Sequence, residues 1–491
     1  MKKRLAHPTA LALVIITLGF SLRLYRLDAQ SFWYDEAYSA EVAEKPPSRI
    51  FAGDFGDNHP PFHSLALHYW GYIGRSDLLL RLFSTMMGTL GITVIYSLGR
   101  LVWDARVGLL AAVMTAILPY QVYYSQEARL YSSLFLATAL LLITYRQTVA
   151  TASRRWWLAY TCCAIWGVYV QYWIAFVLLA VHVHLALHPE RRQLWKRMVL
   201  ADLVVGAAFL PWLATFVSRA LAVARSGFWA ARPGLARLLS APYGFTLSTL
   251  TSEKLVPAAF AVVLFLFLMT HLQAARQLAR QPRDRDGLVL ILSAFWCPVV
   301  LTFLLSQWRS VYLERSLIVA TPALYVLLAW GAVRTRERYA NLVLLLLISI
   351  FAAGGLVNWY FDPAYGKPPF RSVGEVLEAE ACGETPIIHT SDGALLIMMR
   401  YAPHCEHFLL EGDPAPQLPL ETYQALGGGV TTKEELPGET FWLVVALDNS
   451  IEFQRGMVDW IDERYRLAEE HDVEGVYLRR YDGTKPHELS N

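Results

Sequence analysis

The sequence predicts an all-α polytopic membrane bundle of about eleven transmembrane helices that carries a small C-terminal extracytoplasmic α/β domain. Hydrophobic residues make up 55% and charged residues 17% of the 491 residues. The mean hydropathy of +0.34 lies well outside the range of ordinary soluble proteins. Apolar stretches of about 20 residues, the length that crosses a bilayer, recur as far as residue 358 and are absent beyond Asp362. The formal net charge of +2 gives no indication of nucleic-acid binding.

Eleven apolar stretches predict the spans, of which the sixth is the shortest and weakest. They cover residues 9–27, 78–99, 107–124, 130–145, 156–173, 174–188, 198–217, 255–273, 287–306, 316–333 and 341–358. The first resembles a signal peptide, but it is long and no small-residue cleavage site follows, so we expect it to be retained.

Clusters of Lys and Arg in alternate connections predict the orientation of these spans. The clusters are Lys2-Lys3-Arg4, Arg100/Arg106, Arg146/Arg154/Arg155, Arg191/Arg192/Lys196/Arg197, Arg276/Arg280/Arg283/Arg285 and Arg334/Arg336/Arg338. Connections rich in Lys and Arg stay on the cytoplasmic side of a membrane. The protein is therefore expected in the cytoplasmic (inner) membrane, with a cytoplasmic N-terminus and everything after Tyr360 outside.

Two domains follow from this pattern: a membrane domain over 1–358, with a long first outer loop over 28–77, and an extracytoplasmic domain over 360–491. In the second domain, strand-like runs at 386–389, 441–446 and 475–478 alternate with helical runs at 372–381 and 451–465, as in a small α/β domain.

The five cysteines divide along the same boundary. Cys162, Cys163 and Cys297 lie in apolar spans and are expected to be small buried hydrophobic residues. Cys382 and Cys405 lie in the exported domain, where oxidising conditions favour a disulfide between them.

An acidic pair, Asp35-Glu36, stands in the first outer loop, close to the end of the first span. Ionisable groups at a membrane boundary are costly, so their presence indicates a functional site. Other polar residues fall in predicted outer connections: Asn58-His59-Pro60-Pro61, Ser125-Gln126-Glu127-Ala128-Arg129-Leu130-Tyr131-Ser132, and Arg309 to Arg315. Carboxylates, arginines and a histidine are thus expected on one face of the membrane.

In the order and placement of these motifs, the chain resembles bacterial polytopic glycosyltransferases of the C superfamily. Relatives of that group include the protein O-mannosyltransferases and the aminoarabinose transferases that act on lipid A. The resemblance covers roughly residues 1–358, and Arg315 followed by Pro322 and Ala329-Trp330-Gly331 matches a late helix of the group.

The resemblance implies transfer of a sugar from a polyprenyl-phosphate donor to an extracytoplasmic hydroxyl of a lipid, glycan or protein, with inversion at the anomeric carbon. Such a displacement needs a base for the hydroxyl proton, and a carboxylate in hydrogen-bond reach can serve. We assign that base to Asp35. Because adjacent residues of a helix point in different directions, Glu36 is expected to orient the acceptor or to bind a cation.

The leaving phosphate gains negative charge, and cations placed at that charge stabilise the transition state. Arg129, Arg309 and Arg315 are the predicted phosphate ligands, because arginine grips phosphate with two hydrogen bonds. His59 stands where the lipid A branch has a phosphate-contacting lysine, and Glu127 and Tyr131 complete the predicted substrate-binding set. A divalent metal on Asp35, Glu36 or His59 is an open alternative.

Other interpretations of the same residues stay open. Glu127 and Arg129 could form a structural ion pair, Asp35 could cap a helix, and Asp54 and Asp57 are expected to be solvated. The cations of the outer loop 218–254 suit anionic headgroups or an amphipathic surface helix equally well.

His182 and His184 are two residues apart on a predicted helix, so they do not share a face and are expected to be packed polar residues instead of a metal site. For the whole chain, the main alternative function is a transporter or flippase of lipid-linked sugars, which should show paired broken helices and ionisable groups near the midplane. A membrane hydrolase that uses the same carboxylates on water is a third.

Overall fold

The computed structural model describes residues 6–226, 230–280, 282–335, 337–380, 383, 385–412, 418–446 and 451–484. The chain divides into two compact units. Unit 1 comprises residues 1–27, 58–63 and 81–365, and unit 2 comprises residues 28–57, 64–80 and 366–491. Most of the first outer loop therefore belongs to the same unit as the C-terminal residues.

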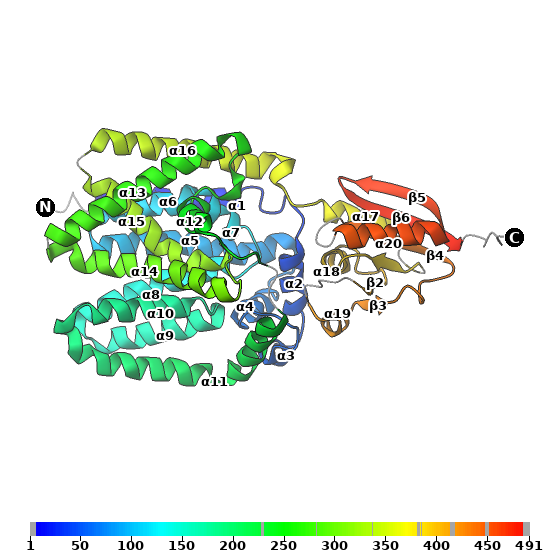
Figure 1. The fold of residues 1–491 in the computed structure, drawn as a ribbon, viewed down its shortest axis with the longest axis horizontal. Coiled ribbons are helices and arrows are strands. Elements are labelled where there is room, and N and C mark those ends of the chain that lie inside the picture. The colour runs from blue at the N-terminus through cyan, green and yellow to red at the C-terminus, as the bar shows by residue number, and fades with distance from the viewer. Residues whose placement is uncertain are drawn as a thin grey trace. The chain divides into compact units, whose positions relative to one another are not determined.

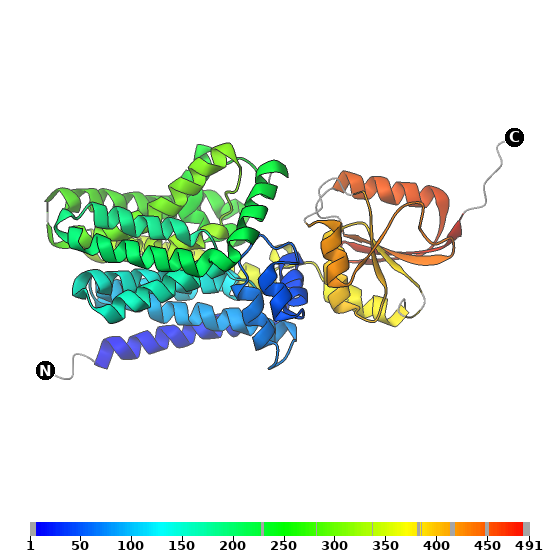
Figure 2. The same cartoon turned by 90° about the horizontal axis from the view of Figure 1, so that it is seen from below.

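Unit 1 is a bundle of helices that run side by side (Figures 1 and 2). Its long elements are α1 (Ala6–Leu24), α5 (Asp77–Val102), α6 (Ala105–Ile117), α7 (Pro119–Ser125), α8 (Tyr131–Thr151), α9 (Arg154–Val170), α10 (Ile174–Ala186), α11 (Trp195–Ser226), α12 (Leu235–Gly244), α13 (Val256–Arg280), α14 (Pro282–Trp308), α15 (Thr321–Arg334) and α16 (Arg338–Phe361). Short 3₁₀ turns lie between them: η2 (Pro189–Leu194), η3 (Ser248–Leu250), η4 (Glu253–Leu255), η5 (Ser316–Ala320) and η6 (Pro363–Tyr365).

Each predicted span coincides with one helix of this bundle, except that 107–124 covers the two helices α6 and α7 and 316–333 begins in η5. In the described part of the chain, seven helices are long and apolar enough to cross a membrane, or eight if the bent pair α6 and α7 forms one span. A helical membrane bundle is thus confirmed, while the number of eleven spans stays a prediction.

The break between α6 and α7, a bend of 60°, follows from Pro119. Proline has no N–H to donate to the carbonyl of Thr115, four residues earlier, and it holds Leu118 in an extended conformation. Arg23 of α1 supplies the missing donors, because its guanidinium bonds the carbonyl oxygens of Thr115 at 2.7 Å and Ala116 at 3.1 Å. A fully buried charge is tolerated here because its N–H groups have acceptors.

Helix α15 is the centre of the bundle, and every residue from Thr321 to Gly331 is buried. A helix that is apolar on all sides belongs in the interior, in contrast to the lipid-facing helices α11 and α16, on which many large apolar side chains are exposed.

Unit 2 contains the three short helices of the first outer loop and the C-terminal domain. The loop helices are α2 (Tyr34–Ala43), α3 (Pro47–Ala52) and α4 (Phe62–Trp70), the last of which begins in unit 1. The C-terminal helices are α17 (Phe370–Glu380), α18 (Asp392–Tyr401), α19 (Leu420–Leu426) and α20 (Ile451–Arg464).

The C-terminal strands form one six-stranded sheet in the order β3-β2-β1-β4-β6-β5. The strands are β1 (Ile387–His389), β2 (His407–Leu410), β3 (Gly429–Thr431), β4 (Thr440–Ala446), β5 (Tyr465–Val473) and β6 (Val476–Thr484). The first four are parallel, while β5 and β6 form an antiparallel hairpin at one edge. Helix α20 covers one face and α17 and α18 the other (Figure 2), which confirms the small α/β domain.

The cysteines of the membrane bundle, Cys162, Cys163 and Cys297, are free thiols. Cys162 is exposed and the other two are half-buried, so none is buried as the sequence predicted. Cys405 is disulfide-bonded. Its predicted partner Cys382 lies outside the described residues, as do Arg336 and the cluster Lys2-Lys3-Arg4.

Candidate active site

The acidic pair lies in the first turn of α2, where two carboxylates are favoured by the partial positive charge of the helix N-terminus. Trp33 precedes the helix in an extended conformation and offers no side-chain cap. Consecutive helical residues point about 100° apart. The side chain of Glu36 is fully buried, whereas Asp35 is only half-buried. The two carboxylates therefore occupy different environments.

Glu36 forms an ion pair with Lys367, a residue that the sequence did not single out. The distance from Lys367 Nζ to Glu36 Oε2 is 2.7 Å, and the two side chains are 8% and 0% exposed. The ammonium also lies over the ring of Trp33, 5.8 Å from its centroid. Charged pairs with this little exposure are stable only when their geometry is good and their other polar atoms are bonded.

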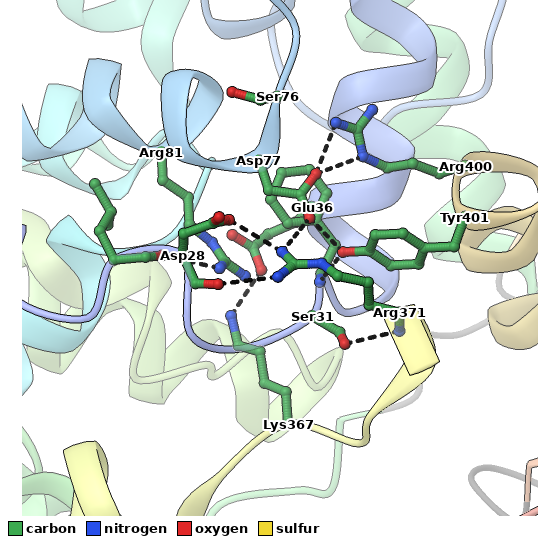
Figure 3. Close-up of polar contacts among 12 residues, drawn as sticks. Asp28, Ser31, Glu36, Ser76, Asp77, Arg81, Lys367, Arg371, Arg400 and Tyr401 are labelled. Atoms are coloured by element: carbon green, nitrogen blue, oxygen red, sulfur yellow. Dashed lines mark hydrogen bonds and ion pairs between the residues drawn. The ribbon is translucent and has the colours of Figure 1, made fainter. Parts of the chain in front are cut away.

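Asp77, at the start of α5, is the centre of a second charged cluster (Figure 3). Its Oδ1 is 2.7 Å from Arg400 and its Oδ2 is 2.9 Å from Arg371, while the Tyr401 hydroxyl donates to Oδ2. Burial and the neighbouring carboxylate raise the pKa of Tyr401 above its ordinary value, so this phenol remains a donor. Arg371 also reaches Asp28 at 3.0 Å.

The segment from Ser125 to Ser132 lies in unit 1, between α7 and α8. Glu127, Arg129 and Tyr131 are 0%, 4% and 2% exposed. Neutral donors hold its backbone: Ser84 Oγ bonds the carbonyl of Arg129 at 3.0 Å, and Thr85 Oγ1 bonds the carbonyl of Ser125 at 3.0 Å.

One of the predicted substrate-binding residues, Tyr131, packs against Tyr124 of α7, with the ring centroids 4.8 Å apart. The hydroxyl of Tyr120 on the same helix donates to the carbonyl oxygen of Glu314 over 2.8 Å. The connection that carries Arg315 therefore lies beside α7.

The remaining predicted residues are spread more widely within unit 1. Arg309 is exposed at the end of α14, and His59 is half-buried in the bend before α4. Glu314, beside Arg315, is 3.3 Å from Arg237, and burial raises the pKa of its carboxyl despite that cation.

Asp54, in unit 2, pairs with Arg49 at 3.0 Å with both side chains exposed. This agrees with the solvated state that the sequence predicted for Asp54.

Among the residues that the structure describes, two groups of side chains have the spacing of metal ligands. His184, His188 and Asp286 form one, and Glu380, Glu469 and His471 form the other. In the first group, the Asp286 carboxylate also forms salt bridges with Arg191 at 2.6 Å and with Arg146 at 3.2 Å. Two guanidinium groups on one carboxylate suit an ion-pair cluster better than a divalent cation. No cofactor is established, and a metal on Asp35, Glu36 or His59 stays a prediction.

His182 lies apart from that group and contacts Asp202 at 2.8 Å. The prediction of packed polar residues fits His182, whereas His184 belongs to the ion-pair cluster of Asp286.

Comparison with known proteins gives a family match and a fold. Residues 58–218 match the family model described as dolichyl-phosphate-mannose-protein mannosyltransferase. No curated protein sequence matches the chain significantly.

Solved structures match nearly the whole chain. ArnT from Cupriavidus metallidurans in the apo state has a TM-score of 0.66 at 15% identity, over 96% of this chain and 98% of that chain. ArnT bound to undecaprenyl phosphate has a TM-score of 0.61 at 14% identity, over 97% of both chains.

The archaeal oligosaccharyltransferase AglB from Archaeoglobus fulgidus, in complex with an inhibitory peptide and a dolichol-phosphate, has a TM-score of 0.56 at 12% identity. That match covers 100% of this chain and 75% of AglB. At these identities the likeness is one of fold. Together with the family model, it confirms the resemblance to polytopic glycosyltransferases of the C superfamily.

Proposed function

We propose that the chain is an integral membrane glycosyltransferase that moves a sugar from a polyprenyl-phosphate donor to an acceptor hydroxyl. The observation that carries this proposal is the half-buried Asp35 in the first turn of α2, in a chain that has the ArnT fold over nearly its full length. Support for the donor class comes from the neighbours, because ArnT binds undecaprenyl phosphate and the AglB complex holds a dolichol-phosphate.

In the proposed reaction, Asp35 accepts the proton of the acceptor hydroxyl. The acceptor oxygen then forms a bond to the anomeric carbon while the bond from that carbon to the phosphate oxygen breaks. The lipid phosphate leaves with the electron pair, and the anomeric configuration inverts. A positioned carboxylate contributes about 10²- to 10⁴-fold to such a step.

The residues proposed to bind the leaving lipid phosphate are arginines of unit 1. Arg129 suits this role best, because it is buried, and a cation withdrawn from water acts strongly on a developing negative charge; half-buried Arg315 is the next candidate. Exposed Arg309 and half-buried His59 are the weaker candidates. Glu127 and Tyr131 are proposed to orient these groups and the sugar.

We also propose the orientation that the Lys and Arg clusters predict, with the C-terminal domain and the first outer loop outside the cytoplasm. A reporter fused after Ala150 should report a cytoplasmic location, and a reporter fused at the C-terminus should report a location outside the cytoplasm. A cytoplasmic C-terminus would overturn the proposed site, because Asp35 depends on the same orientation.

The test of function is transfer of label from a radiolabelled polyprenyl-phosphate sugar into envelope extract by the purified protein. Asp35→Asn should lower turnover by about 10²- to 10⁴-fold with little change in donor binding. Asp54→Asn, which alters an exposed carboxylate of the same loop, is the matched control and should be unchanged.

Near-normal turnover of Asp35→Asn would remove the base from that residue. A transporter would instead carry the donor across vesicles with the bond between sugar and phosphate intact, so label that never leaves the polyprenol would favour that alternative.

A further inference from the structure

Helix α2, which carries Asp35, is contacted near both ends by residues of the C-terminal domain. The backbone N–H of Phe32, just before the helix, donates to the hydroxyl oxygen of Tyr401 over 2.7 Å. Beyond the other end, Lys45 Nζ donates to the carbonyl oxygen of Leu426 over 2.7 Å. A shift of α2 along its axis would break one of these bonds.

The rotation of α2 about its axis is restrained by the pair of Glu36 and Lys367. Their charged atoms are 2.7 Å apart and almost completely withdrawn from water. Because the local dielectric is low, the attraction is strong. Turning the helix would separate a buried carboxylate from this counter-ion, which is strongly unfavourable.

The segment that carries Lys367 is itself fixed to the residues that precede α2. The N–H of Lys367 donates to Gln30 Oε1 at 3.1 Å. The N–H of Arg371 donates to Ser31 Oγ at 2.9 Å (Figure 3). These two bonds start from the backbone, so they place the base of the lysine side chain and not only its flexible end.

Asp35 and Glu36 are neighbours on α2, so the direction of one fixes the direction of the other, about 100° around the helix. We propose that Lys367 is a positioning residue: by holding Glu36, it sets the direction in which Asp35 projects. The C-terminal domain thereby takes part in the reaction through the helix that it holds. This inference rests on the proposed function, since it assumes that Asp35 is the base.

The first test compares Lys367→Met with Lys433→Met. Lys433 is a lysine of the same domain that lies over Trp460, 5.3 Å from the ring centroid, so it controls for the loss of a lysine. Lys367→Met should lower kcat by about 10- to 100-fold, the effect of a misplacement of roughly 1 Å, while the donor KM stays within about twofold. Lys433→Met should change neither.

The charge-exchanged variant, Glu36→Lys with Lys367→Glu, keeps both charges and tests the pair even if Lys367→Met does not fold. The kcat of this variant should be at least about tenfold higher than the kcat of Glu36→Lys alone. A folded exchange variant with no recovery overturns the proposal, as does a Lys367→Met variant that behaves like Lys433→Met. If Asp35→Asn retains normal turnover, the assignment of Asp35 as the base fails independently of the Lys367 variants, and if no label leaves the polyprenol in the unaltered protein, the proposed function fails.

Discussion

Helix α2 in unit 2 and the segment from Ser125 to Ser132 in unit 1 both carry predicted site residues, but contacts of different kinds surround them. Around α2, charged side chains from far along the chain form ion pairs, such as Lys367 with Glu36. The backbone carbonyls of the segment in unit 1 accept hydrogen bonds from neutral hydroxyls, such as that of Ser84, which donates to Arg129.

This difference determines what a substitution does. Removing one partner of a buried ion pair leaves a charge in a poorly solvated place, whereas removing one hydroxyl loses a single neutral hydrogen bond. Substitutions in the network of unit 2 should therefore have larger effects on stability than substitutions of similar size around the segment in unit 1.

The largest effect on stability is expected for Asp77→Ala. Arg400, whose side chain is only 11% exposed, would lose its carboxylate at 2.7 Å. Breaking such a pair costs about 3 kcal/mol. Hydrogen exchange of the α2 and α18 amides should show this loss locally. Unchanged protection in both helices would contradict the importance of the charged network.

A smaller effect is expected for Ser84→Ala, which removes the donor to the carbonyl of Arg129 from a fully buried site. The loss should be about 1 kcal/mol, measured as thermal stability of the purified protein. The matched control is Ser97→Ala on the same helix, because the Ser97 hydroxyl bonds Thr93 at an exposed site. Equal losses for both variants would show that the segment does not depend on this bond.

The smallest effect is expected for Glu41→Gln in α2, and its sign depends on pH. Burial and the neighbouring Glu44 raise the pKa of Glu41. The folded state then binds the proton more tightly than the unfolded state, so stability falls as pH rises from the unfolded value of about 4.3 through the folded pKa. Glu41→Gln should accordingly stabilise the protein at pH 7, and the gain should vanish below about pH 4. Thermal melts at both pH values check this, and an equal shift at both would contradict it.

Much of the fold could be predicted because its signals are local. A run of about 20 apolar residues forms a helix in a bilayer whatever its neighbours are, so the predicted spans lie on helices, down to the short α10, although 107–124 is divided between α6 and α7. Five elements of the C-terminal domain, β1, β4, β6, α17 and α20, followed in the same way from alternating and helical apolar patterns, whereas β2, β3, β5, α18 and α19 were not predicted. The break at Pro119 was not predicted: proline interrupts a helix, but the apolar run 107–124 continues across it.

The candidate site was only partly accessible from the sequence. The acidic pair and the segment with Glu127 and Arg129 stood out because charges are rare near a membrane. Arg23 is also a charge in a predicted apolar span, but no neighbouring residue in the sequence indicated that its guanidinium donates to the carbonyls left without a donor at Pro119. Asp77 and Lys367 gave no signal, because single charges beside loops are common.

The sequence alone determined that this is a helical membrane protein with a small α/β domain and an acidic pair near the membrane boundary. Only the tertiary structure decided that Asp35 and Glu36 differ, because the partner of Glu36 lies 331 residues further along the chain. Periodicity and composition describe neighbours along the chain. An ion pair between distant residues depends on where folding brings the two side chains, and the energy that makes it matter comes from the water excluded around them.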